Sequence, residues 1–86
     1  MNSNMEENEE VLSFAKRLKK LSVWLENGLQ FTGGDRDVAE ENEDREAVAG
    51  YEATMETYSE VLDDLRELFP EVFTCEGKYY NVRANE

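Results

Sequence analysis

The chain of 86 residues contains 21 Asp and Glu, 9 Lys and Arg and no His, which gives a formal net charge of -12. Without His, the sequence lacks the usual general base, the imidazole partner of a nucleophilic Ser or Cys, and imidazole metal ligands. The single Cys75 excludes an intrachain disulfide and a zinc site built from several Cys. The strong negative charge repels nucleic acid and anionic lipid, so we expect direct binding to neither.

The first predicted element is a helix over residues 7–27. Its apolar residues recur every three or four positions, at Val11, Phe14, Leu18, Leu21 and Leu25. We expect residues 1–8 to be frayed and Asn27-Gly28 to end the helix, because Gly adopts the left-handed C-cap conformation readily. Residues 28–37, which include Gly33-Gly34, form the predicted loop between two helices.

The second predicted helix is clear from Ala47 onward. The segment from Val38 to Arg45 is nearly all charged and fits either helix or loop. Beyond it, apolar residues return at helical spacing, with Tyr51 and Tyr58 seven residues apart on one side. Pro70 ends this helix at or before Phe69.

The C-terminal residues 71–83 predict a short β-hairpin, because the apolar pattern changes to alternation and Glu76-Gly77 suits a two-residue turn. In that register Phe73 pairs with Tyr80 on the face that packs on the helices. Tyr79 falls on the opposite face, where it is a candidate contact for a partner protein.

Together these elements predict a mainly α protein of the α+β class. An antiparallel pair of long amphipathic helices is followed by the short hairpin, in a single small domain over residues 1–86. A core this small is marginally stable alone, so a homodimer is a further expectation. No segment approaches the roughly 18 apolar residues of a membrane span, and the N-terminus lacks the order of a signal peptide. We therefore expect a cytoplasmic protein that contacts no membrane.

Acidic residues concentrate on the second helix. From Glu46 to Leu65 there are six carboxylates and no Lys or Arg. Like charges four residues apart on a helix destabilise it by about 0.2–0.5 kcal/mol per pair, so stability alone does not favour this pattern. The predicted partner-binding residues are the carboxylates that this spacing gathers into one acidic ridge: Glu52, Glu56, Glu60, Asp63, Asp64 and Glu67.

Such a ridge is typical of a surface that imitates a nucleic-acid backbone. Carboxylates four residues apart on a helix are separated by about 6 Å along its axis, and every second phosphate of one DNA strand by about 6.8 Å. The predicted partner is a basic protein surface. We therefore expect a non-enzymatic inhibitor that blocks the cationic site of a DNA- or RNA-binding enzyme, of the anti-restriction or anti-CRISPR kind carried by phages and other mobile elements.

The predicted loop near Thr32 also sets which charges meet. Folding the chain there brings the basic cluster Lys16–Lys20 close to Asp44–Val48, where it neutralises Glu40–Glu46. Glu6–Glu10 then approach Ala53–Tyr58, which concentrates negative charge at the end distant from the loop.

Two other interpretations stay open. In the first, the chain is a helical dimerisation or adaptor module whose acidic face only keeps it in solution. In the second, an EExxE-like run at Glu40–Asp44 followed by the ExxD of Glu60–Asp63 resembles the Mg²⁺ site of MazG-like nucleotide pyrophosphohydrolases, with Asp44 in place of the third Glu. That resemblance implies an all-α, Mg²⁺-dependent enzyme. The primary interpretation needs no cofactor, metal site or catalytic residue.

Overall fold

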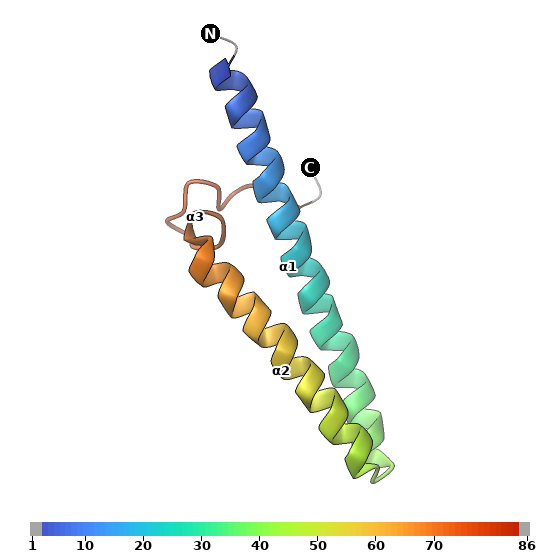
Figure 1. Cartoon of the computed structure of the whole chain (residues 1–86). Coiled ribbons are helices and arrows are strands. Elements are labelled where there is room, and N and C mark those ends of the chain that lie inside the picture. Colours follow the sequence, from blue (N-terminus) through green and yellow to red (C-terminus); the bar gives the residue numbers. More distant parts are fainter. Residues whose placement is uncertain (1–2, 85–86) are drawn as a thin grey trace. The chain divides into compact units, whose positions relative to one another are not determined.

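The computed structural model describes residues 3–84 and the side chains of residues 9–84. It contains three helices, α1 (Ser3–Glu41), α2 (Arg45–Leu68) and α3 (Pro70–Phe73), and no strand within the described range (Figure 1). The mainly helical prediction is confirmed, and the predicted C-terminal β-hairpin is wrong. Among the described residues, every helix lacks an apolar stretch long enough to cross a membrane.

The chain divides into two compact units, described separately below. The hairpin unit comprises Trp24–Asp64, and the terminal unit comprises Met1–Val23 together with Leu65–Glu86. Both units contain parts of α1 and α2, so no linker separates them in sequence, and the single-domain assignment stays a prediction. The segment 1–8, predicted to be frayed, is helical from Ser3 onward, and residues 1–2 lie outside the described range.

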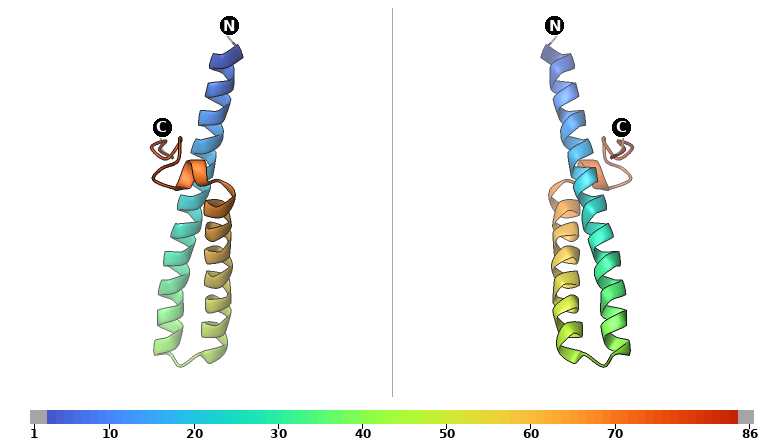
Figure 2. Two further views of the ribbon diagram at one scale, coloured as in Figure 1. Left: turned by 90° about the vertical axis from the view of Figure 1, so that its left-hand side faces the viewer. Right: turned by 90° about the vertical axis from the view of Figure 1, so that its right-hand side faces the viewer.

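The hairpin unit consists of the second part of α1 and most of α2, which run side by side in opposite directions (Figure 2). The contacts between them follow an antiparallel register. A Cβ at Gly28 would lie 3.1 Å from the Tyr58 ring, and one at Gly33 would lie 3.6 Å from the Met55 methyl group. Buried Ala39 and Leu62 complete this small interface.

The predicted inter-helix loop at 28–37 is wrong, because α1 continues through it to Glu41. Each Gly in a helix costs about 1 kcal/mol relative to Ala, and the sequence prediction gave this cost too much weight. The contact between Gly28 and Tyr58 shows what offsets it, since a bare backbone lets the facing helix approach closely. Tertiary packing therefore keeps this segment helical.

The turn lies instead at Asn42–Asp44. The amides of Glu43 and Asp44 donate to the carbonyls of Glu40 and Ala39, over 3.1 and 2.9 Å, and Glu43 has a φ of 57°. This is a Schellman C-cap, with Glu in the left-handed position that Gly usually takes. Asp44 then caps α2 at once, because its Oδ1 accepts a hydrogen bond of 3.1 Å from the Ala47 amide.

Gly34 provides a direct test of this account. It is exposed within α1, and nothing lies within 4 Å of an added Cβ. We expect Gly34→Ala to raise the free energy of unfolding by about 1 kcal/mol through helix propensity. Gly28→Ala is the matched control, because its Cβ meets the Tyr58 ring and cancels the gain. Urea unfolding followed by circular dichroism measures both, and an equal gain from the two variants would contradict the close approach at Gly28.

The terminal unit is built around four buried apolar residues, Ala15, Leu18, Leu65 and Val72. The rings of Phe14 and Phe69 meet edge to face, with their centroids 5.9 Å apart. Pro70 occupies the first turn of α3, where its missing N–H costs nothing, and α2 ends before it as predicted.

Where a β-hairpin was predicted, α3 is followed by successive turns. The Gly77 amide donates to Thr74, the Tyr80 amide to Gly77 and the Val82 amide to Tyr79, each to a carbonyl three residues back. An isolated two-stranded hairpin is marginal in water, so the alternating pattern alone does not enforce strands. The segment instead contacts α1 through Lys19, whose Nζ donates a hydrogen bond to the Tyr80 carbonyl over 2.8 Å. The same Nζ lies 5.7 Å from the centroid of the Phe73 ring.

Candidate acidic binding surface

The acidic ridge occupies the solvent side of α2. In the hairpin unit, the side of α2 that faces α1 carries half-buried Tyr51, Met55 and Tyr58 and buried Leu62. At about 100° per residue, the predicted carboxylates of this unit fall on the opposite side of the helix, within an arc of about 120°. All of them are exposed: Glu52, Glu56, Glu60, Asp63 and Asp64. The helical periodicity of the sequence therefore correctly predicts that these five side chains lie on one accessible face.

Net negative charge is concentrated in the hairpin unit. Residues 24–64 hold 13 Asp and Glu against 2 Lys and Arg, a net charge of -11, whereas the remaining residues hold 8 against 7, a net charge of -1. The chain is thus polarised between its two units. An acidic field of this strength draws cationic groups toward the hairpin unit and accelerates their association.

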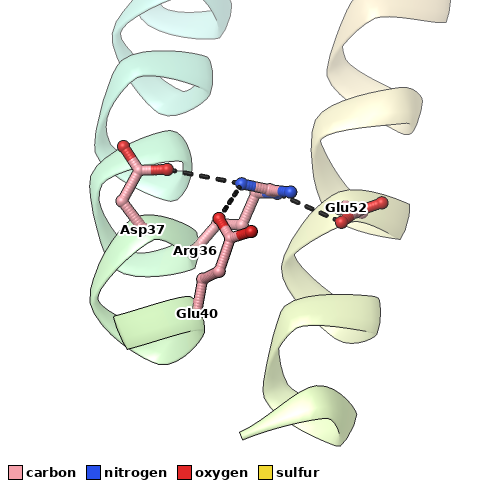
Figure 3. Close-up of polar contacts among 4 residues, drawn as sticks. All are labelled: Arg36, Asp37, Glu40 and Glu52. Carbon is pink, nitrogen blue, oxygen red and sulfur yellow. Dashed lines mark hydrogen bonds and ion pairs between the residues drawn. The ribbon is translucent and has the colours of Figure 1, made fainter. Parts of the chain in front are cut away.

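Arg36 neutralises one end of the ridge. Its Nε donates to Glu52 over 3.1 Å, and its Nη1 donates to Glu40 over 2.9 Å and to Asp37 over 3.4 Å (Figure 3). The hydrogen bond to Glu52, followed by the charge of Glu40, raises the pKa of Arg36 above its ordinary value. Glu52 therefore forms an ion pair within the chain.

Three other carboxylates of the ridge, Glu56, Glu60 and Asp64, differ from Glu52 in their contacts. Within residues 9–84, no hydrogen bond or ion pair engages Glu56, Glu60 or Asp64. Desolvating a carboxylate is costly without a cationic donor, so these three groups favour contact with Lys or Arg over contact with apolar surface.

The other two predicted residues belong to the terminal unit. Glu67 is exposed near the end of α2 and belongs to the terminal unit. Tyr79 also belongs to that unit and is half-buried, with its amide donating to the Glu71 carbonyl over 2.8 Å. Lys78 Nζ lies 5.6 Å from the centroid of its ring. Tyr79 therefore lies in a turn, and the open hairpin face predicted for it does not exist.

The predicted neutralisation of Glu40–Glu46 by Lys16–Lys20 is wrong. That prediction depended on a turn near Thr32, and the turn at Asn42–Asp44 changes which residues meet. Lys16–Lys20 belong to the terminal unit, and Arg36 pairs with Glu40. Opposite Ala53–Tyr58 lies the Gly28–Gly33 part of α1, so the predicted approach of Glu6–Glu10 is also wrong; the side chains of Glu6 and Glu7 lie outside the described range.

The resemblance to a pyrophosphohydrolase site is not supported by the position of its two motifs. Glu40–Asp44 lies around the turn, whereas Glu60–Asp63 lies 16 residues along α2 from Asp44, or about 24 Å at 1.5 Å per residue. A shared Mg²⁺ needs its oxygen ligands at about 2.0–2.1 Å. Among the described residues, no three His, Cys, Asp or Glu side chains are placed to hold one metal ion.

Arg36 is the residue that sequence reasoning missed, because it falls in the predicted loop. Its spacing of four from Glu40 is the helical signal that indicates the ion pair. The side chain of Trp24 is 62% exposed in the chain.

The described residues thus define a helical protein whose hairpin unit has one accessible acidic face. No family model, curated protein or solved structure matches the sequence.

Proposed function

We propose that the chain is a non-enzymatic binding protein whose acidic ridge engages a basic surface on another protein. The observation that carries the proposal is the charge segregation, with a net charge of -11 on residues 24–64 and five predicted carboxylates exposed on one face of α2. Of these, Glu56, Glu60 and Asp64 accept charge-assisted hydrogen bonds from Lys or Arg of the partner. We further propose that this partner is a cytoplasmic DNA- or RNA-binding enzyme, whose phosphate-binding groove receives the ridge.

The ridge blocks the enzyme by competing with nucleic acid for the same cationic groove. Glu56, Glu60 and Asp64 succeed one another at intervals of about 6 Å along α2, which is similar to the separation of alternate phosphates along a DNA strand. Lys and Arg side chains that are arranged for phosphates reach these carboxylates with small changes of rotamer. Because the cationic groove then holds a protein helix, the enzyme cannot bind its nucleic acid.

The test compares two variants with the same change in net charge. The ridge variant is Glu56→Gln, Glu60→Gln and Asp64→Asn; the control variant is Glu26→Gln, Glu41→Gln and Glu43→Gln, at exposed positions outside the ridge. The tagged protein retains partners from cells of its source at low salt, and duplex DNA or RNA then elutes them. We expect a retained nucleic-acid-binding enzyme that is released by nucleic acid.

With that purified enzyme, the dissociation constant is measured for each variant. Loss of three charge-assisted contacts of about 1 kcal/mol each weakens binding by about 100-fold in the ridge variant. The control variant weakens it by less than about threefold, since long-range attraction alone is screened at physiological salt. Equal binding by both variants, or a partner that nucleic acid does not displace, would refute the mimic.

A further inference from the structure

Within the hairpin unit, α1 carries three large apolar side chains that are open to water. Trp24, Phe31 and Val38 are 62%, 78% and 57% exposed, and all three belong to this unit. They recur every seven residues, so they lie along one side of the helix over about 21 Å. Large apolar groups gathered on one exposed face mark a surface that contacts another molecule. These three residues are here called the apolar stripe.

Gly34 lies beside the apolar stripe, three residues after Phe31 and four before Val38, which makes it a neighbour of both on the helix surface. A Gly inside a helix is destabilising relative to Ala. At Gly28 and Gly33 a side chain of α2 uses the space, but at Gly34 nothing lies within 4 Å of an added Cβ. The packing of the chain therefore does not account for this Gly. An open position between two large apolar side chains is what an inserted side chain of a facing helix requires.

Carboxylates border the apolar stripe. Beside Val38 lies a groove of about 260 Å³, and its lining includes Asp35 and Asp44. Asp44 caps α2, whereas no hydrogen bond or ion pair engages Asp35 within residues 9–84. Glu41, three residues after Val38, is also exposed. A molecule that covers the stripe therefore meets negative charge at its edges.

We propose that the apolar stripe docks an amphipathic helix of a partner protein, whose apolar seam is flanked by Lys and Arg. The side chains of Phe31 and Val38 pack against this seam, and one apolar side chain of the partner enters the space over Gly34. Basic groups on the flank of the partner helix reach Asp35 and the groove that it lines. The length of the stripe corresponds to about four turns of the partner helix.

Charge disfavours a second copy of the chain as the occupant. Pairing two apolar stripes would bring together two hairpin units, each of net charge -11. Like charges in direct opposition disfavour association, whereas a helix with basic flanks is attracted to the same surface. Apolar contact and charge therefore agree for a basic amphipathic helix.

The experiment uses a synthetic helical peptide of about three heptads, with Leu at the a and d positions, Lys at e and g, and no Trp. Emission of Trp24, the single Trp of the chain, is followed as the peptide is added to the full-length protein at 0.15 M salt. We expect saturable binding and a shift of the emission to shorter wavelength, because the docked helix removes water from Trp24.

Two control peptides separate apolar contact from charge. The peptide with Glu at e and g, and the peptide with Gln in place of every Leu, each bind at least about 10-fold more weakly than the first peptide. Equal binding of the Glu peptide would overturn the requirement for basic flanks. Equal binding of the Gln peptide would show charge attraction alone and would overturn the apolar docking site.

A truncation of the stripe locates the site on the chain. Phe31→Ala weakens binding of the first peptide by about 30-fold, as is typical of an aromatic hot spot. Val61→Ala, a truncation at an exposed position of α2, weakens it by less than about threefold. Equal effects of the two variants would overturn the proposal. So would a wild-type dimer in sedimentation equilibrium that Phe31→Ala dissociates, because a second copy would then occupy the stripe.

A matched pair of Gly variants separates binding from folding. Gly34→Gln fills the open position and weakens peptide binding by about 10-fold. Gly50→Gln, at an exposed Gly of α2 that also has nothing within 4 Å of its Cβ, changes binding by less than about threefold. Both variants raise the urea midpoint of unfolding through helix propensity, so weaker binding by Gly34→Gln does not reflect a loss of folding. Equal binding by the two variants would contradict insertion at Gly34.

This docking site is independent of the proposed function, because the acidic ridge lies on the side of α2 away from α1. The ridge variant described above, which changes Glu56, Glu60 and Asp64, binds the first peptide within about threefold of wild type, since its distant charges are screened. A loss of peptide binding in the ridge variant would overturn the site on α1. Failure of the docking site and failure of the mimic are therefore distinguishable.

Discussion

We expect Leu62→Asp to unfold the hairpin unit under conditions in which the wild-type chain is folded. Leu62 is 6% exposed and is among the few buried apolar side chains of this unit. A carboxylate at this position would be desolvated without a cationic partner, which costs about 4 kcal/mol. A domain of this size has a total stability of only about 4–13 kcal/mol, so one such change removes much of it.

The matched control is Thr57→Asp, which adds the same charge at an exposed position of the same helix. There the carboxylate stays hydrated, and only repulsion with its acidic neighbours opposes it, at about 0.5 kcal/mol. Urea unfolding followed by circular dichroism at 222 nm compares the two variants. Similar midpoints for both would show that charge, and not burial of Leu62, governs stability.

The sequence predicted most where local pattern and tertiary packing agree. The stripe from Tyr51 to Leu65 predicts the buried side of α2, and Pro70 correctly predicts where that helix ends. The exposed acidic ridge follows from the same periodicity, because the side of a helix away from its core faces solvent. For these features, no knowledge of the rest of the chain is needed.

The wrong predictions share one cause. They rest on local sequence patterns and leave out the tertiary contacts of the same residues. Gly28 and Gly33 predict a loop by propensity, yet each accommodates a side chain of α2 and stays helical. Moving the turn to Asn42–Asp44 then changes every pairing between the two helices. Arg36 therefore meets Glu52, whereas the basic cluster Lys16–Lys20 belongs to the terminal unit. The face of a helix on which a residue lies follows from the local sequence. The pairing of residues between two helices depends also on where the turn between them lies.

The C-terminal turns present a second steric requirement, at Gly77. A Cβ at this residue would lie 2.5 Å from the Glu71 carbonyl oxygen and 2.6 Å from that of Pro70, closer than real Cβ contacts. The same Glu71 oxygen accepts the hydrogen bond from the Tyr79 amide. Backbone atoms cannot move aside as the end of a flexible side chain can, so the segment itself has to shift.

We therefore expect Gly77→Ala to release the turns after α3 while the hairpin unit stays folded. Overpacking of this kind costs about 3 kcal/mol, which corresponds to an increase of about 100-fold in hydrogen exchange at the Tyr79 amide. Gly50→Ala is the control, because nothing lies within 4 Å of its Cβ and the residue lies in the other unit. Unchanged protection of Tyr79 in Gly77→Ala would contradict the close approach. Loss of protection in Gly77→Ala, with Gly50→Ala unchanged, would show that Tyr79 is held by this local packing.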